Sequence, residues 1–323
     1  MDPSSEPIAP PLQFPPPLAA AARAPAAAEV SRPPLWTNLL APFMAFIAAA
    51  VASGTAIAVL ALLSDSNLKR GNFQQELERW IEKSSGSFST TFAFLVPAQV
   101  CFLGVAIFFA VIEREPILPR LGLVRCKASG STVALAVLGS LGVQFLIDVF
   151  AASWIDEPSD SLKMLTRMFL APRGLAAVGV GFLMSVLPGT CEEVLFRGFT
   201  QRGLLRRWSP IVAIGATSLF FGIAHGDVQH SIAVIPLGVW FGYVAWKTGS
   251  VWPAVMCHVL NNLAAFVVMR IWYDADSLDL PMGPATYAVG AGLVAVMLVA
   301  ILRLRRIEPA GAVDPSLAPP IVR

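Results

Sequence analysis

The sequence has few charged residues: only 14% of its 323 residues are Asp, Glu, Lys or Arg, whereas 56% are hydrophobic. Its mean hydropathy of +0.67 lies outside the range of ordinary soluble domains. The net charge of +2 is too small to support binding of nucleic acid or of another acidic partner. We therefore expect an integral membrane protein whose main surroundings are a lipid bilayer.

Cysteine is also scarce, with four residues at positions 101, 126, 191 and 257. Each falls within a predicted membrane span or on the predicted cytoplasmic side, where disulfides are rare. The sequence therefore predicts no disulfide.

Long apolar runs make up most of the chain. A helix needs roughly 20 apolar residues to cross about 30 Å of hydrocarbon. Eight segments approach this length, near residues 36–63, 88–112, 129–151, 174–196, 210–226, 231–246, 251–272 and 285–302. The predicted fold class is all-α: a polytopic membrane helix bundle of about eight transmembrane helices, of which the fifth and sixth are short.

The bundle, residues 35–307, is flanked by two tails. Residues 1–34 form a Pro- and Ala-rich tract that we expect to be a disordered cytoplasmic tail, and residues 308–323 are expected to be a flexible C-terminal tail. An even number of spans puts both termini on one side, and a cytoplasmic placement puts most loop Lys and Arg residues inside. Residues 64–87 carry Phe73 and Trp80 at helical spacing, which indicates an amphipathic helix on the outer membrane surface or a solvated loop with a short helix.

Polar clusters interrupt three of the apolar spans, and the first contains two adjacent glutamates. Neighbouring residues on a helix diverge by about 100°, so Glu192 and Glu193 cannot both face one small site. Glu193 and Arg197 have the i, i+4 spacing of a helical ion pair. Glu192 is then the unpaired acid, and a poorly solvated carboxylate suits a general base near neutral pH.

The other two clusters each place two functional side chains four residues apart, and therefore on one helix face. They are Phe221 with His225, and His258 with Asn262. One carboxylate, two imidazoles and one amide can activate water and hydrogen-bond an oxyanion. The same carboxylate and imidazoles could instead bind zinc and leave a position open for water.

Helical rise gives these clusters partly consistent depths. At 1.5 Å per residue, Glu192 and His225 lie at a similar depth below the turn at Trp208, but His258 lies only about 10 Å beyond Val251. Either the helix predicted near residues 251–272 begins deeper in the membrane than these bounds imply, or the short segment near residues 231–246 does not simply cross the membrane.

Other polar residues favour structural interpretations. His230, in the short loop GDVQHS, is expected to face solvent. Gln144 and Asp148 share a helix face near an outer membrane surface, where Asp148 is typical of a group capped by water. Arg270 is expected to extend from the end of its helix to the interface.

At the three clusters the chain resembles the CPBP family of intramembrane proteases, which includes CAAX prenyl endopeptidases and bacteriocin-processing proteins. The shared pattern is EExxxR, FxxxH and HxxxN, in the family's order. It stands here as Glu192 to Arg197, Phe221 to His225 and His258 to Asn262, and the resemblance covers the motif core, residues 174–272. We accordingly expect a protein of the bacterial plasma (inner) membrane.

The resemblance implies an endopeptidase that hydrolyses a peptide bond of a membrane-associated or lipidated protein or peptide. Glu192 and His225 would activate the water, and His258 and Asn262 would stabilise the oxyanion. The residues expected to shape the site are Glu193, Arg197, Phe221 and Cys191. Both a metalloprotease and a metal-free glutamate mechanism have been argued for the family. We favour the second, because Asn262 is a poor zinc ligand but a good oxyanion donor; the alternative zinc ligands are Glu192, His225 and His258.

Two alternatives stay open at this point. Cys191 precedes Glu192, and a thiol there could act as a nucleophile in a sorting or transpeptidation reaction, although cysteines in apolar helices usually only pack. Buried Glu and His also build proton-coupled transporters, and a membrane scaffold or immunity protein needs no proteolysis. Transporters usually show paired halves, and no internal repeat is evident, which favours the peptidase.

Overall fold

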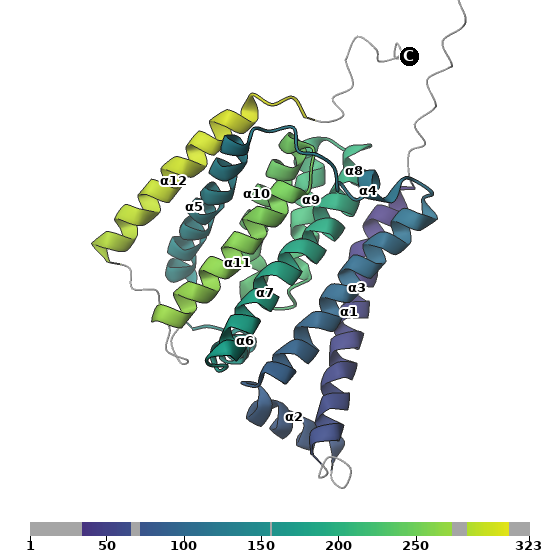
Figure 1. The fold of residues 1–323 in the computed structure, drawn as a ribbon, viewed down its shortest axis with the longest axis vertical. Helices are drawn as coiled ribbons and strands as arrows, with labels where there is room; N and C mark the ends of the chain where they lie inside the picture. The colour runs from purple at the N-terminus through teal and green to yellow at the C-terminus, as the bar shows by residue number, and fades with distance from the viewer. Residues whose placement is uncertain (1–33, 66–71, 156, 273–282, 310–323) are drawn as a thin grey trace, which may run out of the picture. The chain divides into compact units, whose positions relative to one another are not determined.

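The structure is a computed structural model that describes residues 34–65, 72–155, 157–272 and 283–309. Over these ranges the chain is helical and contains no strand, which confirms the all-α prediction. The helices (Figure 1) are α1 (Leu35–Ser64), α2 (Phe73–Ser84), α3 (Phe88–Ile112), α4 (Ile117–Arg120), α5 (Gly130–Trp154), α6 (Asp160–Leu170), α7 (Leu175–Glu193), the π-helix η2 (Val194–Gln201), α8 (Arg202–Leu205), α9 (Pro210–Ile223), α10 (Val228–Thr248), α11 (Trp252–Trp272) and α12 (Pro284–Arg305). The two predicted tails lie almost wholly outside the described residues.

Seven helices within the described ranges are long and apolar enough to cross a membrane. One of them is continuous over residues 175–205, through α7, η2 and α8. The predicted fifth span corresponds to α9, which has 14 residues. At 1.5 Å per residue α9 reaches about 21 Å, which is shorter than the hydrocarbon core. The bundle therefore has seven full-length apolar helices and one partial helix where the sequence predicted about eight spans.

The helices pack in pairs that Figure 1 shows side by side: α1 with α3, α5 with α12, and α9 with α10. The α5–α12 contact is close because it is made at glycine. A Cβ built on Gly142 would lie 2.5 Å from the carbonyl oxygen of Leu293, so a side chain there would push the two backbones apart. Small residues allow such close approach between membrane helices, where van der Waals contact drives association. The motif-bearing helices α7 and α11 lie between the two outer pairs.

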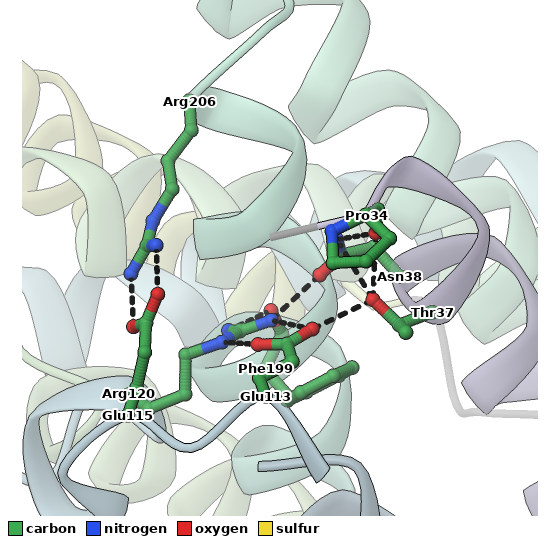
Figure 2. A network of polar contacts seen from close by, with 8 residues as sticks. All are labelled: Pro34, Thr37, Asn38, Glu113, Glu115, Arg120, Phe199 and Arg206. Carbon is green, nitrogen blue, oxygen red and sulfur yellow. Dashed lines mark hydrogen bonds and ion pairs between the residues drawn. The ribbon is translucent and has the colours of Figure 1, made fainter. Parts of the chain in front are cut away.

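A buried polar network joins α1, α3, α4 and η2 at the α4 end of the bundle (Figure 2). Arg120 donates through Nε to Glu113 at 2.5 Å, through Nη1 to the carbonyl oxygen of Phe199 at 2.7 Å, and through Nη2 to Asn38 Oδ1 at 2.7 Å. Thr37 completes the network by donating to Glu113 at 2.6 Å. The side chains of Arg120 and Glu113 are 0% and 1% exposed. We call these five residues the Arg120 network.

Two glycines, Gly198 in η2 and Gly203 in α8, allow close packing at this end of the bundle. A Cβ on Gly198 would lie 2.2 Å from the carbonyl oxygen of Leu121, and one on Gly203 would lie 1.7 Å from Asn38 Oδ1. Neither position can hold a side chain without displacing its neighbour. The segment after α4 and the first turn of α1 therefore lie directly against η2 and α8.

Two amphipathic helices lie outside the full-length spans. The predicted helix in residues 64–87 is observed as α2, whose Trp80 is buried against α1; its position on the membrane surface stays a prediction. The other, α6, was not predicted. Its N-cap Ser159 donates to Asp227 at 2.6 Å, so the turn between α9 and α10 fastens its first end.

Arg270 of α11 fastens the other end of α6. It donates to the carbonyl oxygens of Leu170, the last residue of α6, and of Pro172, two residues further along the chain. Its guanidinium group thereby satisfies carbonyls at a helix end that would otherwise lack donors. The expectation that Arg270 extends to the membrane interface stays a prediction.

Candidate active site

A cavity of about 540 Å³ lies among the motif helices and α1, α3 and α6. Most of its wall is apolar. All four predicted catalytic residues line it: Glu192, His225, His258 and Asn262. The structure therefore brings together, in one space, side chains that the sequence separates by up to 70 positions.

The two glutamates end α7, and the π-helix η2 begins directly after them. Stretches of π-helix are rare and occur mostly at functional sites. Glu192 lines the cavity, whereas Glu193 is fully buried and is not part of its wall. The predicted divergence of the two carboxylates is thus observed, and each has its own set of partners.

Glu193 pairs with Arg197 and also with His258. Its Oε1 accepts from Arg197 Nη1 at 2.9 Å, as the i, i+4 spacing predicted, and from His258 Nδ1 at 2.9 Å. Arg197 further donates to the carbonyl oxygen of Gly238 at 3.0 Å, which the missing side chain of that glycine leaves accessible. Buried charges need such pairing to offset the cost of leaving water. The pair links α7 and η2 to α10 and α11.

Phe221 is the packing centre of the site. Its ring contacts His225 at a centroid distance of 5.0 Å and His258 at 5.7 Å, both edge to face. The Arg197 guanidinium lies 4.4 Å from the ring centroid, in the arrangement of a cation–π contact. The apolar ring thereby separates the two imidazoles and fixes their orientation.

Both histidines use Nδ1 for a structural hydrogen bond. His225 Nδ1 lies 2.8 Å from the carbonyl oxygen of Phe221, and His258 Nδ1 lies 2.9 Å from the Glu193 carboxylate. Both partners can only accept, so Nδ1 carries the proton in each ring. Within the described part of the chain, neither Nε2 has a protein partner. The neutral form of each ring therefore offers an Nε2 lone pair to the cavity.

The start of α11 is fastened to the connection between α4 and α5. Ser250 and Val251 are buried there: Ser250 Oγ donates to the carbonyl of Val124 at 2.7 Å, and the Val251 N–H donates to that of Gly122 at 3.0 Å. The helix begins at Trp252, and His258 lies within hydrogen-bonding distance of Glu193.

Asn262 lies one turn beyond His258 and is held by α7, because its Nδ2 donates to the carbonyl oxygen of Met184 at 3.0 Å. An amide nitrogen carries two hydrogens, so one N–H is left for a ligand in the cavity. The adjacent Asn261 also lines the cavity, but its Nδ2 donates to the carbonyl of Cys257 on its own helix. Motif reasoning did not identify Asn261.

Gln99 of α3 is a second polar residue that the motifs did not identify. It is buried in the cavity wall and donates to Glu192 Oε1 at 2.9 Å. The available signal was a lone amide within the apolar run FLVPAQVCFLG, since polar groups within membrane spans usually face the protein interior. No local spacing connects this position to Glu192, which is 93 residues away.

The prediction that His230 faces solvent is wrong. Asp227 caps α10 by accepting from the His230 backbone N–H at 2.9 Å, which makes the predicted loop a helix start. The ring then lines the cavity and contacts His225 at a centroid distance of 4.5 Å. The site therefore contains three histidines where the sequence predicted two.

Cys191 lies away from the cavity. It is buried in an apolar cluster with Phe102 of α3 and Ala45 of α1, and it is not part of the cavity wall. This environment is typical of a cysteine that packs as a small apolar side chain.

The predicted zinc ligands do not form a metal site in this arrangement. Throughout the described ranges, no group of three or more His, Cys, Asp or Glu side chains is placed to hold a metal ion. Glu192 Oε1 is already bonded to Gln99. The donor set therefore does not fit a preformed zinc centre.

Comparison with known proteins points to one family. Residues 174–264 match a family model described as Rce1-like, type II CAAX prenyl endopeptidase. A protein of Bacillus subtilis (strain 168) named "Putative membrane peptidase YdiL" is 27% identical over 96 residues, which are 29% of this chain and 38% of that protein. No solved structure matches the chain. The matched segment begins before Glu192 and ends after Asn262, so it contains all three motifs, and the chain is similar over this segment to membrane peptidases.

Proposed function

We propose that this protein is an intramembrane endopeptidase that hydrolyses a peptide bond in a membrane-associated or lipidated protein or peptide. The observation that carries the proposal is the convergence of Glu192, His225, His258 and Asn262 on one cavity in a bundle of apolar helices. These groups can supply a base, a water-binding site and oxyanion donors, which amide hydrolysis needs. The family match supports the same class of reaction.

The reaction begins with a water molecule held between Glu192 and the Nε2 lone pair of His225. Glu192 takes one proton as the water oxygen attacks the carbonyl carbon of the scissile bond, and a tetrahedral oxyanion forms. The proton on Glu192 then passes to the leaving nitrogen as the C–N bond breaks. The products are a new carboxyl terminus and a new amino terminus, and the carboxylate is restored.

The oxyanion is stabilised by His258 and by the remaining N–H of Asn262. Because His258 gives its Nδ1–H to Glu193, its Nε2 can donate only when the ring is the imidazolium ion. The Glu193 carboxylate orients this ring by accepting its Nδ1–H, in the way a buried acid orients the histidine of a catalytic triad. Arg197 holds Glu193 in position for this purpose.

A membrane-associated substrate is supported by the character of the cavity. Most of its wall is apolar, with aromatic rings from α1, α3 and α6, Phe46, Phe94 and Phe169 among them. An apolar or lipidated segment would lose water-exposed surface on entering it. The basic residues at the α4 end, Arg120 and Arg206 among them, favour a cytoplasmic placement of that end, and with it of both termini, in a bacterial plasma membrane.

The proposal is tested by comparing the termini of membrane proteins between cells that carry the intact chain and cells that carry Glu192→Gln. We expect specific new termini with the intact chain and none with the variant at equal protein level. Asp148→Asn is the matched control, since it removes a second acid of the bundle that bonds to Gln144 and not to any of the four proposed catalytic residues. Identical termini with and without Glu192 would refute the proposal.

A thiol mechanism is separated by Cys191→Ala, which we expect to keep cleavage. Loss of cleavage at a normal protein level would indicate that the Cys191 thiol, and not a water molecule, is the nucleophile. Metal analysis of the purified protein decides whether zinc accompanies the site.

A further inference from the structure

The amide of Gln99 is the only contribution of α3 to the hydrogen bonding of Glu192. Its Nε2 donates to Glu192 Oε1 at 2.9 Å, and the two residues are 4% and 8% exposed. Gln99 lies outside residues 174–264, the segment that carries the family match. The likeness to the family therefore assigns it no role.

The other end of the same amide has no partner. Gln99 Oε1 is buried and accepts no hydrogen bond from any residue that the structure describes. A buried acceptor without a protein partner costs free energy unless a water molecule or a ligand group meets it. Rotating the amide to exchange Oε1 and Nε2 would break the hydrogen bond to the carboxylate but no other.

A carboxamide can bond a carboxyl group in both of its protonation states. Its N–H donates to the carboxylate, and its carbonyl oxygen accepts from the carboxylic acid. A general base passes through both states in each turnover, because it takes a proton from water and then gives it to the leaving group. A fixed donor would bond only the first state.

We propose that Gln99 is a positioning residue that holds Glu192 through both halves of the proton cycle, by donating to its ionised form and, after amide rotation, accepting from its protonated form. This inference rests on the proposed role of Glu192 as the base. Cys191, Glu193 and Arg197 approach Glu192 from its own continuous helix. His258 approaches it from α11, and His225 from the turn after α9. The described helix α3 brings no charged residue, so its contribution is the neutral amide.

The test measures the protonation of Glu192 without any substrate. Dicyclohexylcarbodiimide reacts with protonated carboxyl groups in apolar surroundings, and mass spectrometry of the full-length protein's peptides reports labelling at residue 192 as a function of pH. In Gln99→Met the carboxylate loses its donor. Because hydrogen bonds to charged groups are the stronger ones, labelling is expected to persist to a pH about one unit higher than in the wild type.

Gln99→Glu is the second variant, because its side chain has the same shape and keeps the packing. It places a second carboxyl group beside Glu192, and two such groups cannot easily ionise together. Combined labelling at positions 99 and 192 is expected to extend further toward high pH than in Gln99→Met. Gln144→Met is the matched control: Gln144 also lines the cavity, but it donates to Asp148, so the labelling curve of Glu192 is expected to stay at its wild-type position.

Measurements of kcat and KM distinguish a positioning role of Gln99 from a purely packing role. With the substrate found by the comparison of termini, Gln99→Met is expected to lower kcat about tenfold and to change KM much less, because the hydrogen bond that is lost is the one to the base. Labelling curves for both Gln99 variants that coincide with the wild type would overturn the inference. A shifted labelling curve in a protein that cleaves nothing would keep the Gln99 assignment and refute the proposed function instead.

Discussion

At the scale of single residues, the two adjacent asparagines of the site differ in which helix accepts their hydrogen bond. Asn262 donates across to α7 and lines the cavity beside His258, whereas Asn261 donates back to its own helix. The motif HxxxN identified Asn262 by helical spacing alone. Such spacing predicts the helix face on which a side chain lies but not its hydrogen-bond partners.

We predict that Asn262→Ala lowers kcat by roughly 100-fold, because one donor to the oxyanion is lost, while KM changes little. Asn261→Ala is the matched control and is expected to change kcat less than threefold, within what loss of one local hydrogen bond produces. Steady-state cleavage assays on the purified variants check both values. Equal effects at the two positions would remove Asn262 from the oxyanion site.

Residue-scale prediction succeeded where both members of a pair lie on one helix and failed where they do not. The Glu193–Arg197 ion pair follows from i, i+4 spacing and is observed. Gln99 meets Glu192 only because α3 packs on α7, and no local pattern encodes that contact. His230 was misplaced because the capping role of Asp227 was not recognised in the sequence.

At the scale of elements, the Arg120 network ties the first helices to the π-helix. Arg120 satisfies the carbonyl of Phe199 within η2 and neutralises Glu113 at the end of α3. Removing one member of a buried ion pair leaves the other charge uncompensated, which is more costly than removing both.

We therefore predict that Arg120→Met lowers the free energy of unfolding by about 3–5 kcal/mol. The double variant Arg120→Met, Glu113→Gln is expected to recover part of that loss, because no unpaired charge stays buried. Arg114→Met, at an exposed position in the same connection, is expected to change stability by less than about 0.5 kcal/mol. Thermal unfolding in detergent measures all three, and an additive double variant would contradict the assigned pairing.

Element boundaries were predictable to the extent that apolar length defines them. The seven long helices follow from hydropathy. Within the 174–196 span, however, the change from α7 to η2 leaves no trace in composition. The amphipathic helix α6 was missed because its 11 residues are too short and too polar for a membrane span.

At the scale of the whole molecule, stability depends on pH through a pair outside the spans. The hydrogen bond from Arg206 holds the pKa of Glu115 below its ordinary value of 4.5. A depressed carboxyl pKa stabilises the fold above the unfolded value, and that contribution is lost as the pH falls through the folded value.

We predict that the wild-type Tm falls between neutral pH and about pH 3 by more than the Tm of Glu115→Gln, which lacks the titrating group. Parallel unfolding curves across this range check the expectation. A variant that loses as much stability on acidification as the wild type would show that other carboxyl groups dominate the response.

The fastening of α6 has a mechanical consequence for the entire bundle. Leu162, Leu165 and Phe169 of this helix form part of the cavity wall. One end is bonded to Asp227, two residues after His225, and the other to Arg270, on the helix that carries His258. A displacement of α6 would therefore strain both attachments at once, and with them the segments that carry the two imidazoles.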